Sequence, residues 1–209
     1  MRMSVQVRRR WYAAGLLALV LLGAGAALVF GRGAAPAPAP ELDDYCVVAP
    51  PTPHDPGSGL GLLEARPVPA DARCPVCGMF PARAPEWAAQ ALFANGDTQF
   101  FDSPLTLFLF LHDVGRYSPG RQAGEVAVSY VTDAGGGGWT RAADAYYVHG
   151  SNALGPMRMG NLPAFASATA ARRFASLRGG TVLRAAQITP DVLQGLMAPR
   201  RHAHTAQTP

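Results

Sequence analysis

The pattern of apolar and polar positions begins with one long apolar stretch near the N-terminus. Residues 11–31 form 21 positions without a charge, and a helix of about 20 apolar residues spans a bilayer. Arginines fill residues 8–10 just before it, and such residues stay on the cytoplasmic side. The pattern therefore predicts a transmembrane anchor at 11–31 after a cytoplasmic segment at 1–10. The alternative is a cleaved signal sequence, since small residues lie at 24–26. Both interpretations predict that the folded part of the chain is exported.

Shorter segments of strand and helix character follow from residue 71 onward. Asn95-Gly96 tolerates the positive φ of a two-residue turn and predicts a hairpin over 87–101. Ser103 is an N-cap candidate with Pro104 in the first turn, which predicts a helix over 102–115. A strand over 125–133 completes a β-β-α-β order. The predicted helix has an apolar stripe formed by Leu105, Phe108, Leu109 and His112.

The second half of the chain repeats this order of elements. Strands are predicted over 143–151 and 159–167, a helix capped by Ser167 over 168–180, and a strand over 181–188. Glycines at 135–138 predict a flexible junction, and Thr189 caps a final helix over 189–197. The fold class expected is α+β, with two tandem β-β-α-β units at 71–134 and 140–198. A Pro/Ala-rich linker is expected over 32–70 and a flexible tail over 199–209.

The charge pattern argues against nucleic acid as a partner. The net charge is +4 with a pI near 9.3, but the excess lies at the two ends of the chain. Without these six arginines the remainder is slightly acidic, and its basic residues do not interleave with aromatics. The six are Arg2, Arg8, Arg9, Arg10, Arg200 and Arg201.

Three cysteines carry most of the readable chemistry, and two of them form a C-x-x-C motif at Cys74 and Cys77. A thiol–disulfide enzyme usually has an α-helix that begins at such a motif. Pro81 and Pro85 disfavour an α-helix at this position. A structural zinc site requires two further Cys or His ligands at a matching spacing, and the sequence contains no second C-x-x-C motif. A plain disulfide or inert thiols remain possible. Cys46 lies in the linker and is left over.

Met79 adds a further interpretation of this motif. In an extended segment Cys77 and Met79 project to the same side, so a thiolate and a thioether face one point. Thioethers suit Cu(I), which prefers soft sulfur donors, and are poor ligands for zinc. Met157 and Met159 form a second pair at the same spacing in a Gly/Pro-rich segment, although methionines of this kind also fill cores. His149, at a predicted strand end, is a candidate nitrogen ligand.

The remaining polar residues form no recognisable catalytic set. The sequence offers no Ser/His/Asp arrangement, no convincing carboxylate pair and no phosphate-binding loop. Asp102 is interpreted as a strand-end or helix-cap residue. The chemistry predicted is soft-metal binding, and the candidate ligands are Cys74, Cys77, Met79, Met157, Met159 and His149. We therefore expect a binding protein and not an enzyme.

The chain also resembles a known family, the NosL accessory proteins of nitrous oxide reductase maturation. The resemblance runs from about residue 74 to 188 and rests on "CPVCGMFPAR", "FFDSPLTLFLFL", "SYVTD", "AYYVHGSNALGPM", "LPAFAS" and "GGTVL". It implies a periplasmic Cu(I) chaperone whose tandem β-β-α-β topology is like that of organomercurial lyase. Within it, the C-x-M element corresponds to Cys77 and Met79 and the GPM element to Met157. Family members are typically lipoproteins, whereas this chain is predicted to have a membrane anchor.

The resemblance also implies partners. The expected acceptors of copper are the membrane transporter complex that assembles copper–sulfur centres and nitrous oxide reductase itself, at the inner membrane. The alternative that the residues leave open is a thiol–disulfide redox protein using Cys74 and Cys77.

Overall fold

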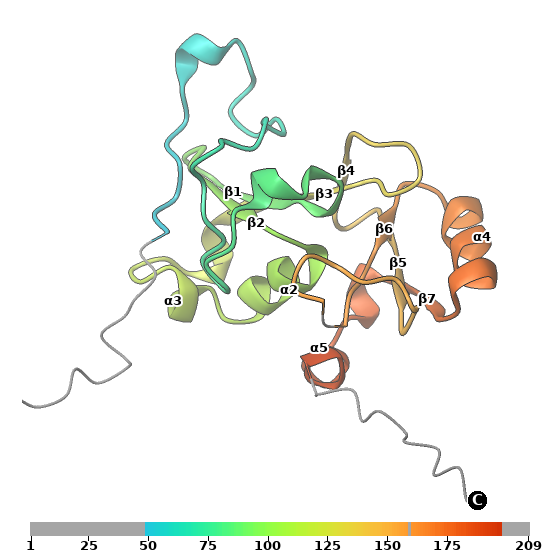
Figure 1. Cartoon of the computed structure of the whole chain (residues 1–209). Helices are drawn as coiled ribbons and strands as arrows, with labels where there is room; N and C mark the ends of the chain where they lie inside the picture. The colour runs from blue at the N-terminus through green and yellow to red at the C-terminus, as the bar shows by residue number, and fades with distance from the viewer. Residues whose placement is uncertain (1–48, 159, 198–209) are drawn as a thin grey trace, which may run out of the picture. The chain divides into compact units, whose positions relative to one another are not determined.

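The computed structural model describes residues 49–158 and 160–197, which belong to one compact unit spanning 47–209. The predicted anchor, Cys46, Met159 and the tail lie outside the described residues. Within the described part, no helix is both long enough and apolar enough to cross a membrane. The elements are α-helices and antiparallel strands (Figure 1), in agreement with the predicted α+β class.

The first sheet is built around the predicted hairpin. Strands β1 (Ala89–Phe93) and β2 (Thr98–Phe101) pair in antiparallel register around the Asn95-Gly96 turn, and every residue of both strands is buried. Gly96 has φ 87°, and a Cβ there would approach Leu62 Cδ1 to 2.5 Å. A side chain at this position is therefore excluded twice, by the backbone and by the packing.

Two more strands extend this sheet to the order β2-β1-β3-β4. Strand β3 (Val126–Thr132) pairs with β1 and with β4 (Trp139–Arg141). The glycines at 135–138, predicted to be a flexible junction, instead form the turn of the β3–β4 hairpin. Asp133 N donates to Gly138 O at 2.9 Å and Gly137 N donates to Asp133 O at 2.8 Å. These backbone bonds hold the junction as regular structure.

Helix α2 (Pro104–His112) begins as predicted, with the Ser103 hydroxyl accepting from Thr106 N. The predicted single stripe is wrong: Leu107 and Phe110, outside the stripe, are fully buried, while His112 is exposed. Burial extends around the helix because β1 and β2 contact it from one direction and α5 (Pro190–Met197) from another (Figure 1). The short helix α3 (Val114–Tyr117) follows.

A second, smaller sheet has the order β6-β5-β7. Its strands are β5 (Tyr146–His149), β6 (Ala164–Phe165) and β7 (Thr181–Arg184). Helix α4 (Ala168–Arg178) lies against this sheet (Figure 1), capped by Ser167 as predicted, and ends at Gly179. The main core crosses between the sheets, since the Phe108 and Tyr147 rings meet at 5.1 Å.

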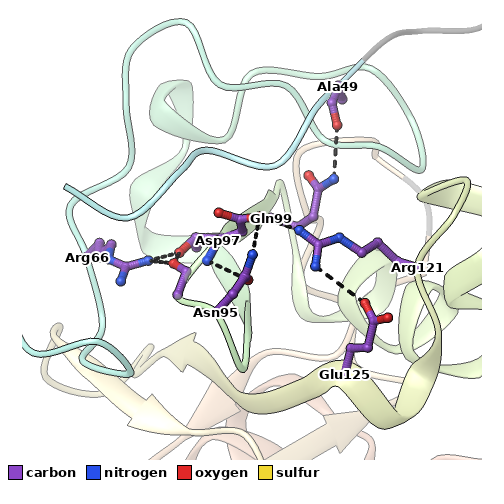
Figure 2. Close-up of polar contacts among 9 residues, drawn as sticks. Ala49, Arg66, Asn95, Asp97, Gln99, Arg121 and Glu125 are labelled. Carbon is purple, nitrogen blue, oxygen red and sulfur yellow. Dashed lines mark hydrogen bonds and ion pairs between the residues drawn. The ribbon is translucent and has the colours of Figure 1, made fainter.

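Residues 49–70, assigned to the linker from the sequence, pack on the first sheet. Thr52 pairs with Thr98 as a β-bridge, and Arg66 exchanges two 3.0 Å hydrogen bonds with the Gln90 amide. The Arg66 guanidinium also donates to Gly96 O and to the Thr98 hydroxyl (Figure 2). Its prolines favour irregular structure, and a 3-10 helix at Pro56–Ser58 is its only helix. Its contacts with the first sheet nevertheless make the segment part of the folded unit.

Candidate metal centre

The C-x-x-C segment folds into a tight loop. Gly78 N donates to Cys74 O and Cys74 N donates to Met79 O, both at 2.8 Å. Gly78 has φ 74°, the left-handed region that favours glycine. Short 3-10 helices at Pro81–Arg83 and Pro85–Trp87 follow, so no α-helix begins at the motif, as the prolines predicted. This loop brings the two thiols close together, and both are free.

Asp102 completes a cluster with these thiols. Its carboxylate and the two Sγ atoms offer ligand atoms that all lie within 4.8 Å of one another. Asp102 follows β2 directly and precedes the Ser103 cap of α2, so the end of the hairpin presents it to the loop. Cys74 is fully buried, Asp102 is 1% exposed and Cys77 is half-buried. The cluster therefore reaches the surface on the Cys77 side.

The hydrogen bonds of Asp102 leave one oxygen unused. Its Oδ1 accepts from the Cys77 thiol at 3.2 Å and from the Thr106 hydroxyl at 2.7 Å. Its Oδ2 is buried and has no hydrogen-bond partner among the described residues. Buried polar atoms in native proteins are nearly always satisfied, so an unsatisfied one calls for an explanation such as an ion.

The two thiols are electrostatically unequal. Burial raises the pKa of the Cys74 thiol, but the hydrogen bond from Cys77 stabilises the Cys74 thiolate and lowers its pKa overall. The pKa of Cys77 is raised, first by its side-chain hydrogen bond with Cys74, then by burial and by the negative charges of Cys74 and Asp102. Two thiols so close together do not both ionise without a counter-ion.

The structure places the predicted ligands unevenly. Cys74 and Cys77 come together, and Met79 closes the same loop through its carbonyl. Met157 is half-buried in a turn at 156–158, where Arg158 N donates to Gly155 O at 2.9 Å. His149 ends β5, half-buried, opposite Thr181. Met159 lies outside the described residues. Among the described residues, His149 is not part of the cluster that the two cysteines form with Asp102.

The Met157 turn nevertheless lies against the segment that follows the cysteine loop. A Cβ on Gly155 would be 3.8 Å from Trp87 Cε3, and Trp87 lines one open pocket together with Asn152 and Leu154. Trp87 comes ten positions after Cys77 in the chain. Gly155, at the start of the Met157 turn, thus lies beside Trp87.

Asp102 is the residue that the sequence analysis missed as a candidate ligand. It was assigned to a strand end or a helix cap, and it does lie between β2 and the N-cap Ser103. Its proximity to Cys77, 25 positions away, is a tertiary contact. The sequence held one signal, an acidic residue inside the apolar run "FFDSPLTLF", because carboxylates are rarely buried without a partner.

The cluster suits metal binding better than thiol–disulfide exchange. A redox thiol needs access for a mixed disulfide and a nearby helix N-terminus to activate it. Cys74 is fully buried and no α-helix begins at the motif. Two thiols at the edge of a rigid loop can instead hold a soft or borderline metal ion.

Comparisons with known proteins place these features in a family. The NosL family model matches residues 65–193. The crystal structure of the copper chaperone NosL from Shewanella denitrificans is similar with a TM-score of 0.52 and 23% identity, covering 61% of this chain and 97% of that one. The solution structure of apo-NosL from Achromobacter cycloclastes has a TM-score of 0.39 and 28% identity, covering 50% and 87%. No curated protein sequence matches significantly.

Proposed function

Because the chain belongs to the NosL family through residues 65–193, a family of copper chaperones, we propose that it is a metallochaperone that binds Cu(I) and passes it on. The cargo is copper, and the activity is binding and transfer without catalysis. The observation that carries the proposal is the convergence of two free thiols in the loop that also contains Met79. Sulfur donors of this kind are those that Cu(I) prefers.

The proposed Cu(I) ligands are the Cys77 thiolate and the thioethers of Met79 and Met157. Cys77 and Met79 belong to one loop, and the Met157 turn lies against Trp87, which supports a shared site. Cys74, Met159 or His149 completes the set. The solved Shewanella relative is described as a copper chaperone, which supports copper as the cargo.

Release of copper follows from the exposure of the ligands. Cys77 and Met157 are half-buried, whereas Cys74 is fully buried. An acceptor thiolate or thioether can therefore reach the ion from the Cys77 side and replace the ligands one at a time. Thioether ligands need no deprotonation and exchange readily, which favours transfer over permanent storage.

We further propose that the chain works in the periplasm, tethered to the inner membrane by residues 11–31. The proposed acceptors are the membrane transporter complex that assembles copper–sulfur centres and nitrous oxide reductase. Family membership and the apolar N-terminal stretch support this assignment. The tandem β-β-α-β organisation belongs to the same proposal, and the shared central position of β1 and β5 in their sheets supports it.

A Cu(I) titration of the reduced full chain against a chelating competitor tests the ligands. Cys77→Ser is expected to weaken Cu(I) binding at least about tenfold, and Met79→Leu and Met157→Leu to weaken it too. Met3→Leu, in the predicted cytoplasmic segment at 1–10, is the matched control and should bind like wild type. Equal Cu(I) affinity in wild type and Cys77→Ser would show that the site is misassigned.

Deletion of the gene in a strain that makes nitrous oxide reductase tests the acceptor. The reductase purified from the deletion strain is expected to contain less copper, and wild-type protein should restore it while Cys77→Ser should not. Full copper content without the chaperone would contradict this part of the proposal.

Thiol–disulfide exchange is the second candidate function, favoured by the short distance between the two thiols. It predicts a reversible redox couple that persists when Met79 and Met157 are replaced by leucine. Copper transfer predicts the opposite dependence, with loss of Cu(I) affinity in the same double variant. Measuring the reduction potential and the Cu(I) affinity of one variant therefore separates the two functions.

A further inference from the structure

The proposed Cu(I) ligands leave Asp102 without a role. Its carboxylate is 1% exposed, and neither ion pair of the described residues involves it. Burying a carboxylate without a cation is costly, and the cost is tolerated where a metal ion or an ion pair compensates it. The Thr106 hydroxyl and the Cys77 thiol bond only to Oδ1. The unsatisfied Oδ2 lies buried in the same cluster as the two sulfurs.

The geometry of the cluster is close to that of a tetrahedral metal site. Zn–S bonds of about 2.3 Å and Zn–O bonds of about 2.0–2.2 Å place neighbouring ligand atoms roughly 3.5–3.8 Å apart. The three donor atoms here already lie within 4.8 Å of one another. The donor atoms therefore need to approach one another only by distances that side-chain rotations can supply, and the backbone need not rearrange.

The charges and donor types of the cluster favour a divalent ion. Two thiolates and a carboxylate carry three negative charges when a metal replaces the thiol protons. A divalent ion leaves less net charge in this buried position than Cu(I) does. A carboxylate is a normal ligand of Zn(II), whereas Cu(I) gains little from a hard oxygen donor.

We propose that Cys74, Cys77 and Asp102 form a three-ligand site for a borderline divalent cation of the Zn(II) class. The ion would be held on the buried side of the loop, with its fourth position open to solvent or to another ligand on the half-buried Cys77 side. Cys77 also belongs to the proposed Cu(I) set, so the two sites share one thiolate. Asp102 is the donor that belongs to the divalent site alone. This site stands whether or not copper is the cargo.

Titration of the reduced full chain with Zn(II) against a competing indicator tests the site, and Co(II) serves as the spectroscopic probe. Wild type is expected to give thiolate-to-Co(II) charge transfer and the visible bands of a tetrahedral ion. Asp102→Asn should lower Zn(II) affinity at least about tenfold while changing Cu(I) affinity by less than about threefold. The double change Met79→Leu with Met157→Leu should do the reverse. Asp113→Asn, at an exposed carboxylate, is the matched control.

Two outcomes overturn the proposal. One is a Co(II) complex of wild type without thiolate charge transfer, and the other is equal Zn(II) affinity in wild type and Asp102→Asn. If circular dichroism shows that Asp102→Asn does not fold, the Cys74→Ser variant tests the site instead. It is expected to lose about half of the thiolate charge-transfer intensity, because one of the two thiolates is removed. Unchanged intensity in that variant contradicts the site. Cu(I) binding by the methionine set is measured separately, so its failure is distinguishable.

Discussion

The first three strands in the chain have the same spatial order in both sheets, but the two sheets have different surroundings. In each sheet the first strand in the chain is central, and a helix capped by serine connects the second strand to the third. The residue before the cap is Asp102 in the first case and Ala166 in the second. Only Asp102 has cysteines beside it. Similar local structure thus supports chemistry in one region alone, because that chemistry depends on what packs against the helix start.

The two helices also differ in burial. Helix α2 is apolar and buried around most of its circumference, whereas Ala171 alone is fully buried in α4. The first sheet has an additional cover, residues 49–70, held by Arg66 and Gln90. The first region, whose strands β1 and β2 are fully buried, positions the cluster, and the second region adds the turn that contains Met157.

The largest expected difference between the regions concerns their aromatic cores. Phe110 is fully buried and packs on Phe101 at 5.0 Å, whereas Phe174 is partly exposed and packs on Phe165 at 5.1 Å. Phe110→Ala is expected to lower the free energy of unfolding by about 3–5 kcal/mol, and Phe174→Ala by clearly less. Chemical denaturation of both variants measures this. Equal losses would contradict the contrast in burial.

A smaller effect is expected from the contacts of Arg66. Replacement by leucine removes the buried hydrogen bonds from the guanidinium to Gly96 O and to the Thr98 hydroxyl, and hydrogen bonds of a charged group contribute about 1.5–3 kcal/mol. Arg172→Leu, at an exposed position of α4, should change the free energy of unfolding by less than about 0.5 kcal/mol. Similar values for both variants would mean that residues 49–70 are not part of the cooperative unit.

The free energy of unfolding is expected to depend on pH through Tyr147, which lies where the cores of the two sheets meet. Its hydroxyl donates to Ala142 O at 2.7 Å, and burial raises the pKa of Tyr147. The folded state holds the phenol proton more tightly, so this stabilisation is complete below the unfolded pKa of about 10 and is lost as pH rises above it. Tyr147→Phe should cost about 1 kcal/mol at neutral pH and show a shallower alkaline loss. Identical alkaline slopes in both proteins would exclude this role.

The smallest effect is expected when the acidic residue is copied into the second region. Ala166→Asp places a carboxylate before α4, but the position is exposed and no cysteine is within the second sheet. The change in unfolding free energy should stay within about 0.5 kcal/mol. In a background with Cys74→Ser and Cys77→Ser, Co(II) should give no visible bands of a tetrahedral ion. A metal site in that variant would show that the acidic residue alone suffices.

Much of the fold was predictable because its signals are local. Asn95-Gly96, the caps Ser103 and Ser167, and Gly179 each act on neighbouring backbone groups, so the hairpin and both helices appear where the sequence placed them. The errors concern burial and packing. The stripe on α2 was too narrow because the helix has neighbours on more than one side, which periodicity within one element cannot reveal.

The sequence by itself identified the candidate donors of the metal centre: a C-x-x-C-x-M segment interrupted by glycine and proline is typical of a loop, and its sulfur atoms are the candidate ligands. Only the tertiary structure decided which third group faces the two thiols. Asp102 reaches Cys77 across 25 positions because β2 ends there and α2 begins, and the cysteine loop packs over that junction. Contacts between distant segments depend on the free energy of the whole packed core, which a motif does not contain.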